Sequence, residues 1–466
     1  MRSAILALML CAACGDDLAL PPLTGTIDQR LAQLPGVTVT EVLPDARNQL
    51  NPAYRYFDLA FTQTIDHGDR ERGAFPQRAA LIHRDDDAPL VVLVGGYDTY
   101  LPRRFSEPAA LAQANQLSLE YRFYGDSHGD PTPWELLDVA QAQADQHAIV
   151  QDLARVYANP HRIVTGGSKG GENALQSMRL YPDDYDGAIA YVAPVITDKP
   201  DLRYAHVLDD IGVAECRDRL RAVQRELLAR RAMVEAHASA ADGARFDHAG
   251  LGKAVETAIV ELEFAYWMEL GPGAPACSQI PTPQATDDQL YAFLDTWSSP
   301  LAYADHDLSV YGQQYIYQDQ TELGYPIWEH AHLDDLLQYS YEDWSRMMPI
   351  GARVPAYDPS VPRDLAAWVE QDAEHVMLVG GEWDPWGAGY PARVPDGRDA
   401  YRFTVAHGSH WSSGIYSLAP ADLPIAFDTV ARWSGASATQ MRALPPELVP
   451  SQRAPGVRAP APRGVW

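Results

Sequence analysis

The chain has 466 residues, which is enough for one large domain with an insertion or for two domains. Hydrophobic residues make up 46% of it, so a sizeable core can form. Asp and Glu number 63 against 36 Lys and Arg, and the net charge of −27 argues against nucleic acid as a partner, because such a surface repels phosphate.

The N-terminus has the shape of a short export signal. Arg2 precedes an apolar run over residues 4–13, which is too short to span a membrane. Small residues then lead to Cys14, and the segment CAACG resembles a bacterial lipobox in which Cys14 is lipidated, although Cys11 stands where leucine is usual. We therefore expect residues 1–14 to be a signal peptide with a lipobox. The exported protein would be lipid-anchored in the cell envelope or, with a plain secretory signal, secreted.

Strand patterns dominate the next part of the chain. Residues 54–84 alternate apolar and polar side chains between turn signals, as in a β-meander. Residues 89–97 and 187–195 are near-continuous apolar runs typical of buried parallel strands, and residues 116–127 indicate a further strand. A helix is predicted over residues 132–158.

The start of this predicted helix carries its own signal. Thr132 and Glu135 have the spacing of a capping box, with Pro133 as the first helical residue. Because strands and helices alternate from residue 89 to 195, the sequence predicts an α/β fold with a mostly parallel sheet and helices on both faces. In such sheets the functional site lies at the carboxyl ends of the strands.

The segment RIVTGGSKGGENAL at residues 162–175 places one serine between a strand and a helix. Gly166, Ser168 and Gly170 fit the G-x-S-x-G pattern of a nucleophile elbow, in which glycines let strand and helix approach closely. The serine then stands at a helix N-terminus, where backbone N–H groups favour a developing oxyanion. The alternatives are a plain turn and a phosphate loop, but the phosphate-loop pattern G-x-x-x-x-G-K-[ST] is not matched.

The second half begins with a helical stretch that we interpret as an insertion over the sheet. Helical spacing runs over residues 216–238 and 251–268, and residues 311–346 are rich in Tyr and Trp. Cys216 and Cys277 remain in the exported chain and are expected to form a disulfide, with two buried thiols as the alternative.

Strand patterns return near the C-terminus, at residues 375–387 and 400–410, before a proline-rich end. The predicted organisation is therefore a core, a helical cap, the rest of the core and a disordered tail: residues 40–199, 200–365, 366–440 and 441–466.

A nucleophilic serine needs a base and an orienting acid. Asp384 directly follows the apolar run VMLVGG, and His407 and His410 follow YRFTVA, so these side chains are expected at late strand ends in the order serine, acid, histidine. Glu382 is a rival acid, His407 is a rival base, and Asp384 with the next proline could instead start a turn. Asp145 and His147 are interpreted as part of a solvated helix face.

Several segments carry a family resemblance: TGGSKGG, YPDDYDGAIAYVAP, EYRFYGDS, YQDQTELGYP and DPWG. Over residues 50–435 the chain resembles the secreted serine tripeptidyl aminopeptidases of bacteria, the thirty-seventh serine-peptidase family, and more distantly the prolyl carboxypeptidase and dipeptidyl-peptidase group. The resemblance implies an α/β-hydrolase fold with a helical cap and a Ser-Asp-His triad, with Asp384 in the DPW segment and His410, rather than His407, in the Gly-x-His segment. Glu172 departs from the expected pattern, which has a methionine there.

The expected function is that of a serine exopeptidase, tripeptidyl or prolyl in type, acting on peptides with free N-termini. Ser168 would attack the carbonyl, His410 would accept the proton, and the N–H groups of Lys169 and Tyr97 would bind the oxyanion. Four carboxylates are the candidates for binding the substrate: Glu120, Asp319, Glu322 and Glu172. Each of the first three could pair with the substrate's ammonium group.

Two other classes of function remain open from the sequence. One is a carboxylesterase, since this fold hosts many acyl transfers. The other is an inactive lipoprotein that binds peptides, against which the intact serine, acid and histidine argue. Neither metal-ligand spacing nor a dinucleotide fingerprint is present, so no metal or cofactor is expected.

Overall fold

The computed structural model describes residues 22–45, 50–97, 103–270 and 277–436. The predicted signal peptide with its lipidation site Cys14, and the predicted tail at 441–466, lie outside these residues. Within the described ranges, no helix combines the length and the apolar character needed to cross a membrane.

Nine strands of the described residues form one sheet in the order β1-β2-β3-β5-β4-β6-β7-β8-β9. The first strands pair antiparallel, and every pair from β5 to β9 is parallel, which confirms the predicted mostly parallel sheet. The chain runs from β4 to β5 on one side and then crosses back to β6 on the other, so the direction of winding reverses next to β4. The strands span Val37–Val42, Arg55–Thr64, Ala74–His83, Leu90–Val94, Asn115–Leu119, Arg162–Gly167, Gly187–Tyr191, Val376–Gly381 and Ala400–Val405.

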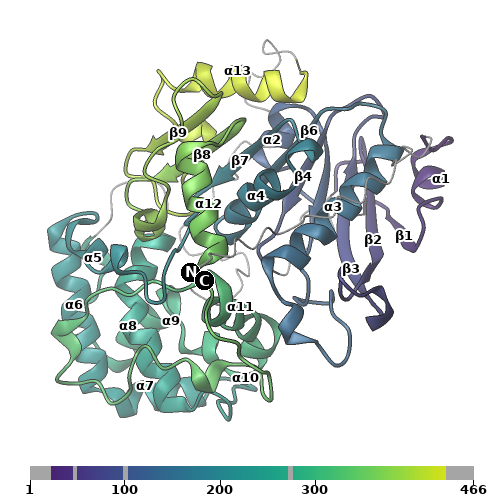
Figure 1. Cartoon of the computed structure of the whole chain (residues 1–466). Coiled ribbons are helices and arrows are strands. Elements are labelled where there is room, and N and C mark those ends of the chain that lie inside the picture. Colours follow the sequence, from purple (N-terminus) through teal and green to yellow (C-terminus); the bar gives the residue numbers. More distant parts are fainter. Residues whose placement is uncertain (1–21, 46–49, 98–102, 271–276, 437–466) are drawn as a thin grey trace, which may run out of the picture.

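Helices cover both faces of this sheet (Figure 1). Side chains alternate between the faces along each strand, so Val92 packs toward one helix layer and its neighbour Val91 toward the other. The first layer comprises α1, α3, α4 and α12 (Ile27–Leu31, Val139–Val156, Lys169–Leu180 and Ser360–Gln371), and the second comprises α2 and α13 (Glu107–Leu111 and Leu423–Ser434). The result is an α/β sandwich of three layers.

A second group of helices lies between β7 and β8 in the chain, and we call this segment the cap. It is drawn below the sheet in Figure 1 and has its own hydrophobic core around α8, whose Trp267 and Leu262 are fully buried. Cys216 and Cys277 form a disulfide in it. Its helices α5 to α11 span Val207–Asp210, Ala214–Ala229, Arg231–Ser239, Leu251–Glu269, Asp287–Trp297, Asp305–Asp307 and Gln313–Gln318. Helix α12 runs across the predicted cap boundary at residue 365 and packs on the sheet.

Two predicted helices differ from the structure. The helix expected from Thr132 begins instead at Val139, where Asp138 accepts the backbone N–H of Gln141 at 2.8 Å, so the predicted capping box is wrong. The carboxylate of Glu135, predicted to complete the capping box, instead accepts a hydrogen bond from the guanidinium of Arg72 at 2.7 Å. The single helix expected over 216–238 is broken at Arg230, whose guanidinium binds the segment that leads into α9.

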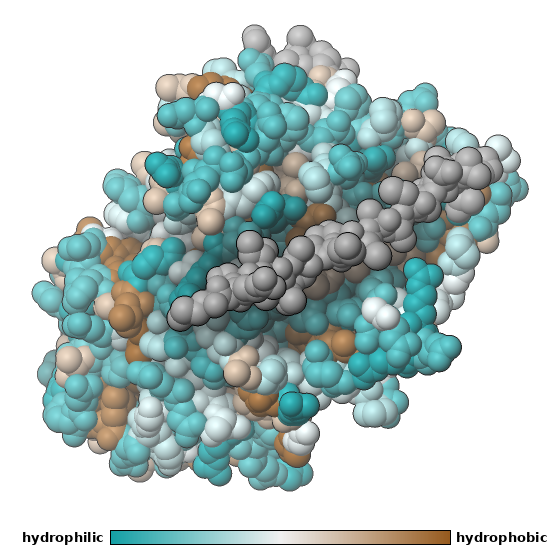
Figure 2. Space-filling model, viewed as in Figure 1, coloured by the Kyte–Doolittle hydropathy of each residue, from teal (hydrophilic) through white to brown (hydrophobic). Residues whose placement is uncertain are grey.

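The face shown in Figure 2 is mostly hydrophilic, with scattered apolar side chains. Such a surface agrees with a chain in which charged residues make up 21% of the sequence.

Candidate active site

Ser168 occupies a sharp turn between β6 and α4. Its backbone has φ 58° and ψ −131°, a conformation that residues with a side chain rarely adopt. A Cβ atom on Gly166 would lie 2.2 Å from the carbonyl oxygen of Gly170, so this position must be glycine. The predicted elbow geometry is therefore present, and it leaves the Ser168 side chain partly exposed at the start of a helix.

Asp384 and His410 form a buried pair at the ends of β8 and β9. The Nδ1 atom of His410 lies 2.6 Å from Oδ2 of Asp384, and both side chains are fully buried. Asp384 also accepts the hydroxyl of Tyr390 and, at 3.0 Å, the backbone N–H of Trp386. Because the carboxylate accepts a proton held at Nδ1, the ring presents Nε2 as the basic atom. That Nε2 atom is buried without a hydrogen-bond partner among the described residues.

The rival acid and the rival base lie together at the surface. The side chains of Glu382 and His407 are 52% and 66% exposed, and Oε2 of Glu382 lies 3.9 Å from Nε2 of His407. The ring of His407 stacks on Trp383 rather than turning inward. The geometry therefore pairs Asp384 with His410 in the interior.

The loop after β4 packs directly against the elbow. The ammonium of Lys169 donates to the carbonyl oxygen of Gly96 at 2.6 Å, and the amide of Asn173 donates to that of Gly95 at 2.9 Å. A Cβ atom on Gly96 would lie 2.8 Å from the backbone nitrogen of Gly170, so the loop that leads to Tyr97 lies against the start of α4. Tyr97 and Lys169 are the two residues predicted to bind an oxyanion. The phenol of Tyr97 also makes side-chain hydrogen bonds with Ser168 and Tyr311, and burial raises its pKa, so it stays protonated.

Three tyrosine rings surround the ammonium of Lys169. Its Nζ lies 3.7 Å from the ring centre of Tyr121, 5.3 Å from that of Tyr124 and 5.4 Å from that of Tyr97. Aromatic faces attract a cation, and this attraction grows where water is excluded. Burial nevertheless lowers the pKa of Lys169, while the carboxylates of Glu172 and Asp319 oppose that shift.

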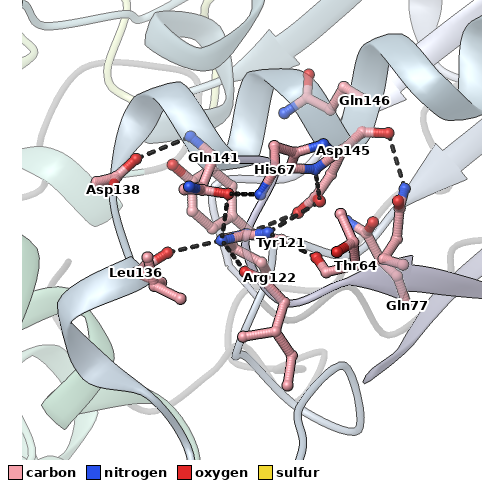
Figure 3. Close-up of polar contacts among 12 residues, drawn as sticks. Thr64, His67, Gln77, Tyr121, Arg122, Leu136, Asp138, Gln141, Asp145 and Gln146 are labelled. Atoms are coloured by element: carbon pink, nitrogen blue, oxygen red, sulfur yellow. Dashed lines mark hydrogen bonds and ion pairs between the residues drawn. The ribbon is translucent and has the colours of Figure 1, made fainter. Parts of the chain in front are cut away.

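A buried polar network holds the segment that carries Tyr121 (Figure 3). Arg122 is fully buried and donates to both carboxylate oxygens of Asp145, at 2.7 and 3.0 Å, and to the carbonyl of Leu136 at 2.7 Å. His67 reaches the same carboxylate at 2.7 Å. The expectation that Asp145 lies on a solvated helix face is therefore wrong, because a charge without solvent needs such partners. The strand predicted over 116–127 is shorter in the structure, because β5 ends at Leu119, before Tyr121 and Arg122.

A pocket of about 330 Å³ opens beside the elbow, and we call it the serine pocket. Ser168, Lys169 and Tyr97 line it, together with the apolar side chains of Pro194, Ile196 and Trp386. Of the four carboxylates predicted to bind substrate, Glu172 and Asp319 also line it.

The other two predicted carboxylates line neither this pocket nor the one next to it. Glu120 accepts the backbone N–H of Ser127 at 3.3 Å, and Glu322 accepts that of Val139 at 2.9 Å, at the start of α3. Both contacts hold backbone segments in place.

The two carboxylates of the serine pocket differ in how well they are satisfied. Glu172 accepts the side-chain amide of Gln176 at 3.1 Å. Asp319 is 5% exposed, and its Oδ1 atom is buried without a partner among the described residues. Burial raises the pKa of both carboxyl groups. The ammonium groups of Lys169 and Lys199 lie near enough to Asp319 to oppose this shift, and Lys169 also opposes it for Glu172.

Within the ranges that the structure describes, no group of three or more His, Cys, Asp and Glu side chains is arranged to hold a metal ion.

A nucleophile elbow and a buried Asp–His pair at the strand ends of a mostly parallel sheet define an α/β-hydrolase. The family model of PS-10 peptidase S37 matches residues 21–452, and the chain belongs to this family of serine peptidases. The prolyl tri/tetrapeptidyl aminopeptidase of Streptomyces mobaraensis is 33% identical over 450 residues, an alignment that covers 93% of this chain and 92% of that protein.

Solved structures of other hydrolases are similar at a much lower level. The proline iminopeptidase of Mycobacterium smegmatis is 13% identical, with 75% of this chain and 91% of that chain covered and a TM-score of 0.36. An esterase from Pyrobaculum calidifontis is 14% identical, with 82% and 87% covered and a TM-score of 0.33.

Proposed function

We propose that this protein is a serine exopeptidase that releases short peptides, tripeptidyl or prolyl in type, from the free N-terminus of a peptide substrate. One observation carries the proposal: the pocket that holds Ser168 also holds Asp319, a buried carboxylate with an unpartnered oxygen. Membership of the peptidase S37 family and the name of the Streptomyces relative support it.

The proposed reaction passes through an acyl-enzyme. Ser168 Oγ attacks the carbonyl carbon of the scissile bond while Nε2 of His410 accepts its proton, and Asp384 stabilises the resulting imidazolium. The N–H groups of Lys169 and Tyr97 donate to the oxyanion, and one such donor is typically worth about 3 kcal/mol. His410 then protonates the leaving amine, and water, activated by the same histidine, hydrolyses the ester on Ser168.

Charge balance explains why a free N-terminus would be preferred. Among the described residues that line the serine pocket, the carboxyl groups of Glu172 and Asp319 outnumber the ammonium of Lys169, while Lys199 acts on Asp319 from nearby. A substrate ammonium at Asp319 would add a cation that donates directly to the unpartnered Oδ1 atom. Anchoring the ammonium at a set position relative to Ser168 also limits how many residues can be released.

The walls of the serine pocket favour an apolar residue next to the cleaved bond. Pro194, Ile196 and Trp386 present apolar surface beside Ser168. A proline ring or another compact apolar side chain can be buried there without an unsatisfied polar group.

The test compares matched peptide chromogens with a free and an acetylated N-terminus. Acetylation removes the charge, and we expect kcat/KM to fall at least tenfold, which corresponds to about 1.4 kcal/mol. A simple acyl ester serves as the control for the acyl-transfer chemistry itself. If blocked peptides or simple esters react as fast as free-amine peptides, the exopeptidase proposal fails and a carboxylesterase function takes its place.

We also propose that the protein is exported and anchored by a lipid on Cys14. The signal-like N-terminus supports this proposal, and so does the Cys216–Cys277 disulfide, since disulfides persist in oxidising compartments. The intact mass of the mature protein tests it: a lipidated Cys14 at the N-terminus is expected, and an unmodified terminus elsewhere would indicate simple secretion.

A further inference from the structure

A second pocket, of about 410 Å³, lies next to the serine pocket and is lined by the cap and by Trp386 from the segment after β8; we call it the cap pocket. The two pockets share three lining residues, Tyr315, Asp319 and Trp386. The border between them is therefore formed in part by Asp319, the carboxylate proposed to bind the substrate ammonium.

The walls of the cap pocket are mainly aromatic. Phe264 on α8 stacks on Trp328 with ring centres 4.5 Å apart, and Trp386 meets Phe264 edge to face at 5.1 Å. Tyr341 and Trp344 extend this wall, with ring centres 5.5 Å apart. Such rings offer a large apolar contact area and favourable edge-to-face geometry to another ring.

Glu261, the carboxylate that lines the cap pocket besides Asp319 among the described residues, is already satisfied. Glu261 accepts the hydroxyl of Tyr303 on one oxygen and that of Tyr341, at 3.0 Å, on the other. Burial raises the pKa of Glu261 to about 7, and the two hydroxyls and the ammonium of Lys253 oppose that shift. Oδ1 of Asp319, at the border of the cap pocket, is a buried oxygen without a partner among the described residues, and most of the lining beyond it is apolar.

We infer that the cap pocket binds a large apolar side chain, aromatic or long aliphatic, of the substrate residue that carries the free ammonium. The ammonium and the side chain of that residue leave the same Cα atom, so an ammonium at Asp319 places the side chain at the entrance to the cap pocket. This inference rests on the proposed exopeptidase reaction and adds a preference for the N-terminal residue.

The test uses three-residue peptide p-nitroanilides that end in proline and begin with Gly, Leu or Phe. Burying a phenyl group is expected to raise kcat/KM about tenfold or more for the Phe peptide over the Gly peptide. The ratio is measured within one enzyme preparation, so the fraction of folded protein cancels.

Ile316→Phe narrows the pocket, because Ile316 lines it from α11. The Phe-to-Gly ratio should then fall to near one, mainly through the Phe peptide. Ile280→Phe is the matched control: both isoleucines are 2% exposed and belong to the same cluster of the cap, but Ile280 lines neither pocket. Its ratio should stay at the wild-type value.

Trp344→Leu supplies a second variant that widens the pocket, and it should lower the preference for Phe more than that for Leu. A wild-type ratio near one overturns the inference, as does an equal fall of the ratio in the Ile316 and Ile280 variants.

The acetylated peptides separate the two proposals. If they react as fast as the free peptides, the exopeptidase reaction fails and this inference with it, whereas a strong acetylation effect with no side-chain preference overturns this inference alone.

Discussion

Replacing Asp319 by asparagine is the most direct test of how the substrate is held. The side chain keeps its shape and loses its charge, so a substrate ammonium would lose a charge-assisted hydrogen bond at Oδ1. Hydrogen bonds to charged groups are worth about 1.5–3 kcal/mol, and the expected loss in kcat/KM for a free-amine peptide is therefore about 10- to 150-fold. An acetylated peptide has no ammonium to lose and should be affected much less.

The assay is a double-mutant cycle in which the enzyme and the substrate are each changed. Wild type and Asp319→Asn are each measured with the free and the acetylated form of the same peptide, and the coupling energy should be about 1.5–3 kcal/mol. Glu120→Gln is the control, because this carboxylate lines neither pocket and binds the N–H of Ser127. Its coupling energy should lie within about 0.5 kcal/mol of zero.

A coupling energy near zero for Asp319, or a larger one for Glu120, would refute this assignment. The second result would move the ammonium site from the serine pocket to the end of β5. Glu172→Gln, measured in the same cycle, shows how much the second carboxylate of the serine pocket contributes to binding the substrate ammonium.

The same substitution should make the folded protein more stable where the carboxyl group would be ionised. Burial raises the pKa of Asp319 well above its ordinary value. Below about pH 4 the carboxyl group is neutral in both the folded and the unfolded protein, and burying it does not cost the energy of burying a charge. As the pH rises through the raised pKa, the buried group must ionise and the folded protein loses stability. Asparagine carries no charge, so Tm of Asp319→Asn should exceed that of wild type at about pH 8 and match it near pH 4. The same difference in Tm at both pH values would contradict a carboxyl group whose pKa is raised by burial.

Four further outcomes are expected from the same site. Ser168→Ala should remove turnover apart from the residual rate of binding and oxyanion contacts while circular dichroism stays unchanged, and substantial remaining activity would assign the nucleophile elsewhere. His410→Ala should lose as much kcat as that variant and His407→Ala should lose little, because the ring of His407 is exposed; equal losses would contradict the assignment. Lys169→Met should lower kcat about tenfold or more with little change in KM, because the ammonium of Lys169 holds the carbonyl of Gly96 in the loop after β4. A change confined to KM would instead indicate that Lys169 acts in substrate binding. For free-amine peptides, kcat/KM should rise with pH as Asp319 ionises. It should fall again at higher pH as the substrate amine, with a pKa of about 7.7–8.0, loses its proton. For acetylated peptides, kcat/KM should not show this fall at higher pH.

The sequence predicted the parts of the fold that depend on neighbouring residues. A buried parallel strand is a short apolar run, and an elbow is a serine between closely spaced glycines, so β4, β6, β7 and the turn at Ser168 could be placed from the local pattern. Helix ends were harder to place. Thr132 and Asp138 can each cap a helix, and the choice of Asp138 depends on where the preceding segment is held, which includes the contact of Glu135 with Arg72.

The same limit applies to buried charges. Asp145 lies in an amphipathic helix and would be expected to face solvent, yet Arg122 and His67 reach it from segments far away in the chain. Tyr390, which donates to Asp384, and Asn173, which holds Gly95, have no sequence signal that would have marked them as part of the site.

By itself, then, the sequence determined the α/β architecture, the position of Ser168 and the strand ends at which an acid and a histidine would be found. The tertiary structure added that Asp384 and His410 are paired in the interior while Glu382 and His407 lie at the surface, and it showed which of the predicted carboxylates enter the serine pocket. The physical reason is that local patterns set backbone conformation, whereas the side chain that faces the interior depends on how distant strand ends and loops pack together. Residues two or three positions apart after a strand can point to opposite environments, and burial with a partner is then what separates a reactive group from a surface one.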